Sequence, residues 1–211
     1  MLHIPQLLKS YGELDVLNIN NFRIDQGLYW IQGANGTGKS TFFKAISGII
    51  SFKGDSIIDN VSLTQSPVEY RKKITYCEAE PEFPSFLTQK DLLQFVANAR
   101  GATQEQIEKL QEALGTKLYE NQPIGTNSSG MLKKTGLILA FLGQPSIILL
   151  DEPFTAIDHQ SVDNLIELII EYQSTYKVTF LVTSHIDSEH YHLPFNSVYK
   201  IEDKNIVKID E

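Results

Sequence analysis

Short, almost continuous apolar runs recur along the chain and are separated by amphipathic or glycine-containing segments. Ile147–Leu150 and Val178–Thr183 are runs of this kind, and they predict central strands buried on both faces. Leu28–Ile31 is a third such run. Weaker strand patterns predict further strands at Ile19–Ile24, Gly54–Ile58, Lys73–Cys77, Ser197–Ile201 and Asn205–Ile209.

The segments between these runs carry helical patterns. Apolar residues recur at helical spacing in Gln89–Ala99 and in Thr103–Leu114, where Thr103 is suited to cap the helix. Three more helices are predicted, at Thr41–Ile46, Leu132–Phe141 and Gln160–Tyr172. Strands that alternate with helices in this way favour an α/β protein with a mostly parallel sheet.

The chain has 211 residues, enough for one sizeable domain with a buried core. We expect a single domain whose core comprises residues 1–77 and 146–211, with a helical subdomain inserted at 78–145. Hydrophobic residues make up 42% of the chain and charged residues 21%, as in ordinary folded proteins. The formal net charge of −8 argues against a nucleic-acid partner, because neutralising phosphates requires a basic face.

The chain contains one cysteine, Cys77, so no disulfide can form within it, which suits a reducing cytosol. The segment Met1–Gln6 has neither the charged start nor the apolar core of a signal peptide. The longest apolar runs are far shorter than the roughly 20 residues that span a bilayer. We therefore expect a cytoplasmic protein that does not itself cross a membrane.

Residues 33–40, with the sequence GANGTGKS, fit the phosphate-binding loop pattern G-x-x-x-x-G-K-[ST]. A predicted strand precedes the loop and a predicted helix follows it, which is the context that the pattern requires. The glycines let successive N–H groups point at phosphate oxygens, and the helix N-terminus adds partial positive charge. Lys39 would reach the β/γ-phosphates and Ser40 would hold Mg²⁺. The alternative is a glycine-rich turn followed by chance by Lys-Ser.

Two carboxylates, Asp151 and Glu152, directly follow the apolar run that ends at Leu150. A buried strand that ends in Asp delivers the carboxylate to the edge of the sheet where α/β folds bind ligands. Asp151 would hold Mg²⁺ through water. Glu152 would orient the water that attacks the γ-phosphate. The alternative is a strand that ends in an ordinary acidic turn.

His185 follows the last of the three strong apolar runs. A parallel neighbouring strand that ends at the same edge would bring His185 beside the γ-phosphate, where it would contact that phosphate and the water. A histidine with a purely structural role is the alternative. His190 and His192 could ligate a metal, but no further ligand spacing supports such a site.

In this order the motifs resemble those of the nucleotide-binding subunit of an ABC (ATP-binding cassette) transporter, nearly from end to end. Gly33–Ser40 resembles the Walker A motif, and Ile147–Asp151 resembles Walker B with Glu152 at the catalytic position. Thr155–Asp158 resembles the D-loop and His185 the switch histidine. The resemblance implies a P-loop NTPase (RecA-like) core with a mostly parallel sheet, an N-terminal antiparallel β part and an inserted α-helical subdomain.

The resemblance also implies contacts with the cofactors ATP and Mg²⁺. Tyr11 stands where the family places an aromatic residue that stacks on adenine, and Val16 where an apolar residue packs near the nucleotide. Ser40 and Asp151 would be the metal contacts. The implied phosphate-binding residues are Gly33, Ala34, Asn35, Gly36, Thr37, Gly38, Lys39, Ser40 and Thr41.

Asn127–Met131 resembles the ABC signature, which is normally Leu-Ser-Gly-Gly-Gln. Small residues at a helix N-terminus present N–H groups to a phosphate, and in this family the phosphate belongs to ATP bound by the other subunit. The resemblance therefore implies a head-to-tail homodimer. A polar helix cap is the alternative. The implied signature contacts are Ser128, Ser129, Gly130 and Met131.

Two positions depart from the family pattern. Ser129 replaces the first glycine of the signature and adds a side chain where the γ-phosphate approaches. Ala79 stands at the position of the Q-loop glutamine, and alanine cannot contact Mg²⁺ or the attacking water. Glu78 and Glu80 flank it, and either could substitute.

We therefore expect an ATPase subunit that lies on the inner face of the cell membrane and drives a separate integral-membrane permease. The permease would dock on Glu78–Phe86 and the helical segment, and it would set the transported substrate and the direction of transport. One alternative is a soluble ABC-type ATPase that acts on nucleic acid or ribosomes. The other is a regulatory cassette that binds ATP with little turnover, which Ala79 and Ser129 leave open and which Lys39, Asp151, Glu152 and His185 argue against.

Overall fold

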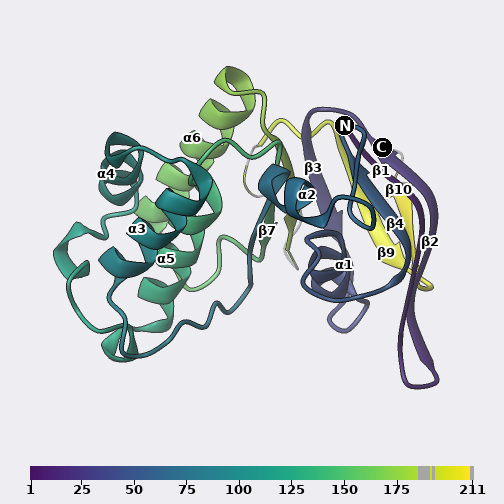
Figure 1. Ribbon diagram of the computed structural model, residues 1–211, viewed down its shortest axis with the longest axis horizontal. Helices are drawn as coiled ribbons and strands as arrows, with labels where there is room; N and C mark the ends of the chain where they lie inside the picture. The colour runs from purple at the N-terminus through teal and green to yellow at the C-terminus, as the bar shows by residue number, and fades with distance from the viewer. Residues whose placement is uncertain (185–190, 192, 210–211) are drawn as a thin grey trace.

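The computed structural model describes residues 1–184, 191 and 193–209. Two β-sheets lie on one side of the molecule and a group of helices on the other (Figure 1). The antiparallel sheet has the strand order β2-β1-β4-β5, and the larger sheet has the order β10-β9-β3-β8-β7-β6. The antiparallel sheet contains β1 (Leu2–Tyr11), β2 (Leu14–Ile24), β4 (Lys53–Ile58) and β5 (Val61–Ser62). The larger sheet contains β3 (Leu28–Gln32), β6 (Ile74–Cys77), β7 (Ile147–Asp151), β8 (Thr179–Thr183), β9 (Ser197–Glu202) and β10 (Asn205–Ile209).

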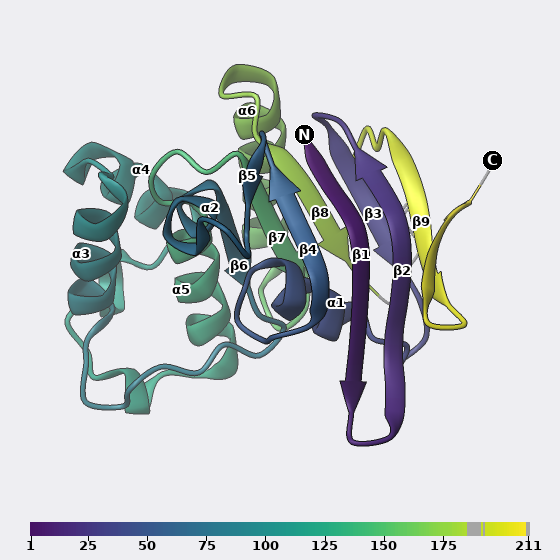
Figure 2. The same ribbon diagram turned by 45° about the vertical axis from the view of Figure 1, so that its right-hand side comes forward.

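The larger sheet is mostly parallel. Strands β6, β7, β8, β3 and β9 run in the same direction, and β10 pairs antiparallel with β9. The α/β class, the mostly parallel sheet and the N-terminal antiparallel part are thus confirmed. In Figure 2 the antiparallel strands β1, β2 and β4 lie in front of the parallel sheet.

Helices lie in the connections from β3 to β6, from β6 to β7 and from β7 to β8. Between β6 and β7 the chain forms α3, α4 and α5, which gather on the side of the molecule away from the antiparallel sheet (Figure 1). The helices are α1 (Lys39–Ile46), α2 (Pro67–Lys73), α3 (Gln89–Arg100), α4 (Gln104–Ala113), α5 (Ser129–Phe141) and α6 (His159–Thr175), with 3-10 turns at Lys117–Tyr119 and Ile124–Thr126. The division at residues 78 and 145 stays a prediction.

Alternate residues of the parallel strands face two separate cores. In β7, Ile148 and Leu150 pack in the core shared with α5 and α6, whereas Ile147 and Leu149 pack in the core shared with α1 and the antiparallel sheet. Side chains in a strand alternate between faces, so the next residue, Asp151, falls on the α1 face. The apolar run therefore sets the direction in which the carboxylate points.

Local sequence signals account for the helix ends. Thr88 caps α3 in a capping box, in which its hydroxyl accepts from the Asp91 N–H and the Asp91 carboxylate accepts from the Thr88 N–H. Gly101 ends α3 in a left-handed conformation with φ 68°. The predicted cap Thr103 begins α4, where its hydroxyl accepts from the Gln106 N–H.

Several elements differ from the sequence-based prediction: β2 begins at Leu14 instead of Ile19, and the two-residue strand β5 was not predicted. Strand β1 and the seven-residue helix α2 were not predicted. Helix α5 begins at Ser129 instead of Leu132, because Ser128 caps it by accepting a hydrogen bond from the Met131 N–H at 3.3 Å.

Candidate nucleotide-binding site

Three strands bring the predicted chemistry to one edge of the sheet. Ile31 in β3 pairs with Thr183 in β8, and Thr183 pairs with Asp151 in β7, so the three residues lie in one row. Adjacent strands are about 4.8 Å apart, which places Asp151 about 10 Å from the strand that leads into the glycine loop. The row lies at the carboxyl ends of parallel strands, where open α/β sheets bind ligands.

The loop between β3 and α1 has a backbone that depends on glycine. Gly36 and Gly38 have φ values of 81° and 104°, in the left-handed region that side chains disfavour. Gly38 occupies the N-cap position of α1, and no side chain caps the N–H groups of that helix. No acidic residue lies in its first turn. The helix N-terminus is therefore suited to an anion.

Lys39 folds back over the loop that it follows. Its Nζ donates hydrogen bonds to the carbonyl oxygens of Gly33, at 2.6 Å, and Ala34, at 3.3 Å. Thr37 Oγ1 donates to the same Ala34 carbonyl at 2.9 Å. The ammonium group thus lies against the backbone of the loop, within reach of a phosphate that would bind there.

The carboxylate of Asp151 is buried and held by two neutral hydroxyls. Tyr76 Oη donates to Oδ2 at 3.0 Å, and Thr183 Oγ1 donates to Oδ1 at 2.5 Å. Burial raises the pKa of Tyr76 far above its usual value, and the charge of Asp151 acts in the same direction. Tyr76 therefore remains a protonated donor. Asp151 itself is 1% exposed.

The donor set fits Mg²⁺. Within the described residues, no cation forms an ion pair with the Asp151 carboxylate, whose two oxygens accept hydrogen bonds from hydroxyl groups. No group of three or more His, Cys, Asp or Glu side chains there could cage a metal. Mg²⁺ is usually held by one or two protein oxygens plus substrate phosphates and water. Ser40, exposed in the first turn of α1, and Asp151 match that requirement.

Glu152 adopts an unusual backbone conformation directly after β7. Its φ is 46°, and Ala156, four residues on, has a φ of 62°. The Glu152 N–H donates to the Thr183 carbonyl at 3.1 Å, and Thr155 Oγ1 donates to the Glu152 carbonyl at 2.8 Å. A non-glycine residue in this region is strained and requires support from its surroundings.

The predicted signature residues lie at an exposed helix end. Ser128 and Ser129 are exposed, and Ser128 is the N-cap residue of α5. Ser129 does not have a positive φ, so serine fits there without backbone strain. A Cβ on Gly130 would lie 2.5 Å from the Ala156 carbonyl oxygen, which shows how closely the signature packs on the D-loop segment.

A second contact joins these two segments. Lys134 Nζ lies 2.6 Å from Asp158 Oδ2, and Asp158 caps α6 by accepting from the Ser161 N–H at 3.0 Å. The hydrogen bond from Lys134 and that from the Ser161 N–H hold the pKa of the Asp158 carboxyl well below its usual range. The signature helix and the D-loop segment are therefore joined by packing and by charge.

The remaining predicted contacts lie around the loop. Val16 Cγ1 would be 3.3 Å from a Cβ on Gly38, so Val16 packs directly against the loop. Tyr11 is 53% exposed, and the Lys9 ammonium lies 4.7 Å from its ring centroid. The Tyr11 ring is accessible for stacking. Thr41 is half-buried in the first turn of α1, and His185 lies outside the described residues, as do His190 and His192.

The segment at the Q-loop position has its side chains directed elsewhere. Glu78 Oε2 pairs with Lys44 Nζ of α1 at 2.8 Å, and Glu80 is exposed. Ala79 offers no polar side-chain atom. Sequence reasoning missed Tyr76 and Thr183 as neighbours of Asp151, although the parallel pairing of three strands would have placed both nearby. It also missed Lys133, whose Nζ donates to the Asp151 carbonyl at 2.7 Å.

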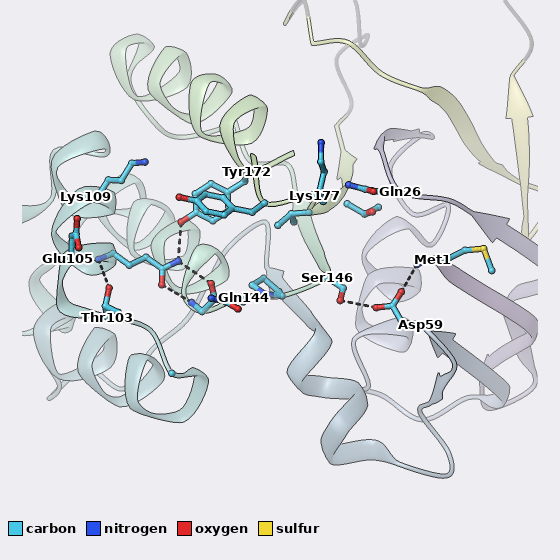
Figure 3. A pocket seen from close by; sticks show the side chains of 17 residues that line it. Met1, Gln26, Asp59, Thr103, Glu105, Lys109, Gln144, Ser146, Tyr172 and Lys177 are labelled. Carbon is cyan, nitrogen blue, oxygen red and sulfur yellow. Dashed lines mark hydrogen bonds and ion pairs between the residues drawn. The ribbon is translucent and has the colours of Figure 1, made fainter. Parts of the chain in front are cut away.

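A separate pocket of about 750 Å³ lies at the opposite end of the sheet (Figure 3). Ser146 and Thr179, which line it, stand where β7 and β8 begin, whereas Asp151 and Thr183 stand where these strands end. Some of its polar side chains bond one another, as when Asp59 accepts from the Ser146 hydroxyl at 3.0 Å. The pocket is thus remote from the glycine loop.

Comparison with known proteins agrees with this geometry. The family model described as ABC transporter matches residues 17–155. A lantibiotic transport ATP-binding protein of Streptococcus pyogenes, SrtF, is 32% identical over 194 residues, which cover 92% of this chain and 83% of that protein.

Solved structures agree in the same way. The structure of an ATP-binding subunit of an ABC transporter superposes with a TM-score of 0.87 at 25% identity, covering 99% of this chain and 89% of that chain. The dimeric ATP-binding cassette MJ0796, solved in a post-hydrolysis state bound to ADP and Pi, has a TM-score of 0.84 at 20% identity, with all of both chains covered.

The fold and the glycine loop define a P-loop NTPase of the α/β class. The chain belongs to the ABC transporter family, as the resemblance predicted. None of the helices in the part of the chain that the structure describes is long and apolar enough to cross a bilayer.

Proposed function

We propose that this chain binds and hydrolyses ATP and drives a separate membrane permease. The observation that carries the proposal is that Ile31, Thr183 and Asp151 lie side by side on three adjacent strands. This pairing brings the glycine loop, which follows β3, and the buried Asp151 carboxylate to the same edge of the sheet. Lys39 would leave the carbonyls of the loop and bind the β/γ-phosphates. Ser40 and Asp151 would hold Mg²⁺, which neutralises charge on the phosphate oxygens when bound.

Hydrolysis would depend on Glu152. The Glu152 N–H donates to the Thr183 carbonyl, so the backbone of Glu152 is fixed directly after the proposed metal-binding residue Asp151. From this position at the edge of the sheet, the Glu152 side chain would orient the attacking water. His185 would contact the γ-phosphate from the neighbouring strand. The exposed N-terminus of α5, with Ser128–Met131, would bind the ATP of a second copy in a head-to-tail dimer.

The permease would contact the loop after β6 and the adjacent helical segment. Phe86 in that loop is 80% exposed and Leu118 is 94% exposed. These exposed apolar side chains would be available for contact with the permease. SrtF is named for lantibiotic transport, and we propose a transport role of the same general kind, without assigning a cargo.

Two variants test the ATPase. Lys39→Ala should weaken MgATP binding about 10-fold or more, since a charge-assisted hydrogen bond is lost. Glu152→Gln should bind MgATP normally, lose about 100-fold or more in phosphate release, and increase the dimer on gel filtration with ATP. Glu82→Gln, which changes an exposed carboxylate on the nearby loop, is the control.

Each outcome distinguishes one part of the proposal. Unchanged MgATP affinity in Lys39→Ala would refute the assignment of the loop, and no added dimer in Glu152→Gln would refute the ATP sandwich. Normal binding with negligible turnover in the unmodified chain would instead support a regulatory cassette, which Ala79 leaves open. Purification from membranes with a polytopic partner would support transport, and a ribosomal or DNA partner would contradict it.

A further inference from the structure

The ammonium group of Lys133 is buried against three main-chain carbonyls. Lys133 lies on α5 and is 1% exposed. Its Nζ donates to the Asp151 carbonyl at 2.7 Å, the Glu78 carbonyl at 2.8 Å and the Ala79 carbonyl at 3.0 Å. An ammonium group has three N–H donors and no acceptor, so these carbonyls satisfy all of them. The buried Nζ of Lys133 is thus fully hydrogen-bonded inside the fold.

One of these bonds fixes the peptide that joins Asp151 to Glu152. The carbonyl oxygen of this peptide belongs to Asp151 and accepts from Lys133 Nζ. The N–H of the same peptide belongs to Glu152 and donates to the Thr183 carbonyl at 3.1 Å. The peptide plane is therefore held at both ends. This plane orients the proposed metal-binding carboxylate on one side and the left-handed Glu152 on the other.

The other two bonds fix the segment at the Q-loop position. Lys133 reaches the carbonyls of Glu78 and Ala79 from α5, and Lys44 of α1 reaches the Glu78 carboxylate from the opposite side at 2.8 Å. The Lys44 pair is over a third exposed on both side chains and contributes little on its own. The buried contact from α5 is the stronger of the two.

The face of α5 that carries Lys133 approaches this segment closely. A Cβ on Gly136, three residues further on, would lie 2.9 Å from Pro81 Cγ and 3.3 Å from Cys77 Sγ. Ala140, seven residues further on, accepts a hydrogen bond from Thr75 Oγ1 at 2.7 Å. Residues at this spacing share one helix face, so α5 is anchored to the end of β6 along two turns.

We propose that Lys133 is a positioning residue that links the signature helix to the nucleotide site through main-chain carbonyls. The proposal rests on the proposed ATPase function. Because α5 carries the signature at its N-terminus, a shift of this helix would displace the 78–79 segment and the Asp151–Glu152 peptide together. The link does not require a side chain at position 79, which is alanine here.

The test compares Lys133→Met and Lys133→Gln with the unmodified chain. Met and Gln are both one bond shorter than Lys and match each other in length, but Met has no donor whereas Gln keeps two N–H donors. Because the glycine loop is untouched, kcat for phosphate release should fall about 10-fold or more in Lys133→Met, while MgATP affinity stays within about threefold. Gln should lie between Met and Lys. Lys90→Met, an exposed lysine of α3, should behave as the unmodified chain.

Amide hydrogen exchange without nucleotide provides a second measurement. The Glu152 N–H should exchange faster in Lys133→Met and in Lys133→Gln, with the melting temperature measured alongside. If the unmodified chain shows no ATPase activity, the proposed function fails, and the exchange measurement still tests the link. If Lys133→Met does not fold, the same separation of kcat from affinity in Lys133→Gln supports the link.

Three results would overturn the link. The first is that Lys133→Met has the same kcat and the same Glu152 N–H exchange rate as the unmodified chain. If Lys133→Met does not fold, the same result in Lys133→Gln has this meaning. The second is a parallel loss of kcat, affinity and melting temperature, which indicates a structural role only. The third is Gln performing no better than Met where both fold, because the number of donors would then be irrelevant.

Discussion

The hydroxyl of Tyr76 donates a hydrogen bond to the carboxylate of Asp151 over 3.0 Å, from the neighbouring strand of the sheet. Thr183 supports the second carboxylate oxygen from the strand on the other side. The carboxylate thus has a fixed orientation before any metal binds. Partners that orient a metal-binding group affect metal affinity strongly even though they do not touch the metal.

Tyr76→Phe should raise the Mg²⁺ concentration that half-saturates ATP hydrolysis about 10-fold, because Asp151 loses one of its two orienting donors. A Mg²⁺ titration of phosphate release measures this. Tyr70→Phe is the matched control, since the Tyr70 hydroxyl donates to the Ile46 carbonyl at 2.7 Å and is remote from Asp151. The control should lose about 1 kcal/mol of unfolding free energy and keep its Mg²⁺ dependence. An unchanged midpoint in Tyr76→Phe would contradict the orienting role.

Asp158→Asn should reduce stability at neutral pH and leave it unaltered in acid. The pKa of Asp158 is lowered in the folded chain, so its contribution is present above the unfolded pKa of about 4 and disappears as the pH falls through the folded value. Asn still caps α6 but cannot pair with Lys134. Because Asp158 is largely exposed, the loss at pH 7 should be at most about 1 kcal/mol.

Urea unfolding from pH 7 down to pH 2 checks this expectation. The curves of the variant and the unmodified chain should approach each other as the pH falls below about 4. A constant difference over the whole range would show that the carboxylate charge is not responsible. Lys134→Met should reproduce the neutral-pH loss, because it removes the other member of the pair.

Ser129→Gly should leave ATP hydrolysis within about twofold of the unmodified chain. The backbone at Ser129 needs no left-handed conformation, so glycine relieves no strain there. Glycine in the first turn of α5 should instead lower the unfolding free energy by about 0.5 kcal/mol. Steady-state phosphate release and urea unfolding provide the two readings. A large increase in kcat would mean that the serine side chain obstructs the phosphate in the dimer.

The thiol of Cys77 should react with a disulfide reagent only when the fold opens. Burial raises the pKa of Cys77 to about 11, and the residue is 1% exposed. The reaction at pH 8 should therefore be at least about 100-fold slower than in urea, which corresponds to an opening free energy of about 3 kcal/mol. Since Cys77 is the one cysteine of the chain, absorbance reports it directly. A rapid reaction in native buffer would contradict the burial.

The most continuous apolar runs could be predicted from the sequence, because such runs specify buried strands. The glycine loop could be predicted as well, because its backbone conformation requires glycine. Strand β1 could not, because Pro5 interrupts its pattern and lacks an N–H. The pairing of β1 with β4 shifts between His3 and Gln6, which accommodates the proline. Helix α2, with seven residues and only Tyr70 buried, is too short to show a period.

The surroundings of Asp151 were hidden for a different reason. Lys133 contacts main-chain carbonyls, which every residue carries, so no residue type marks its partners. A lysine in a helix is normally solvated. Only its place on the same face as Gly136 and Ala140 distinguishes it, and that becomes visible once the helix is packed on β6.

The contact between Gly130 and Ala156 has a consequence for how the signature can vary. Any side chain at 130 would have its first carbon within 2.5 Å of a carbonyl oxygen, whereas the side chain at 129 is exposed. In a library randomised at both positions, functional clones should therefore accept many residues at 129 and almost none but glycine at 130. We expect mutational tolerance at these two positions to follow the distance to the Ala156 backbone rather than the distance to a phosphate.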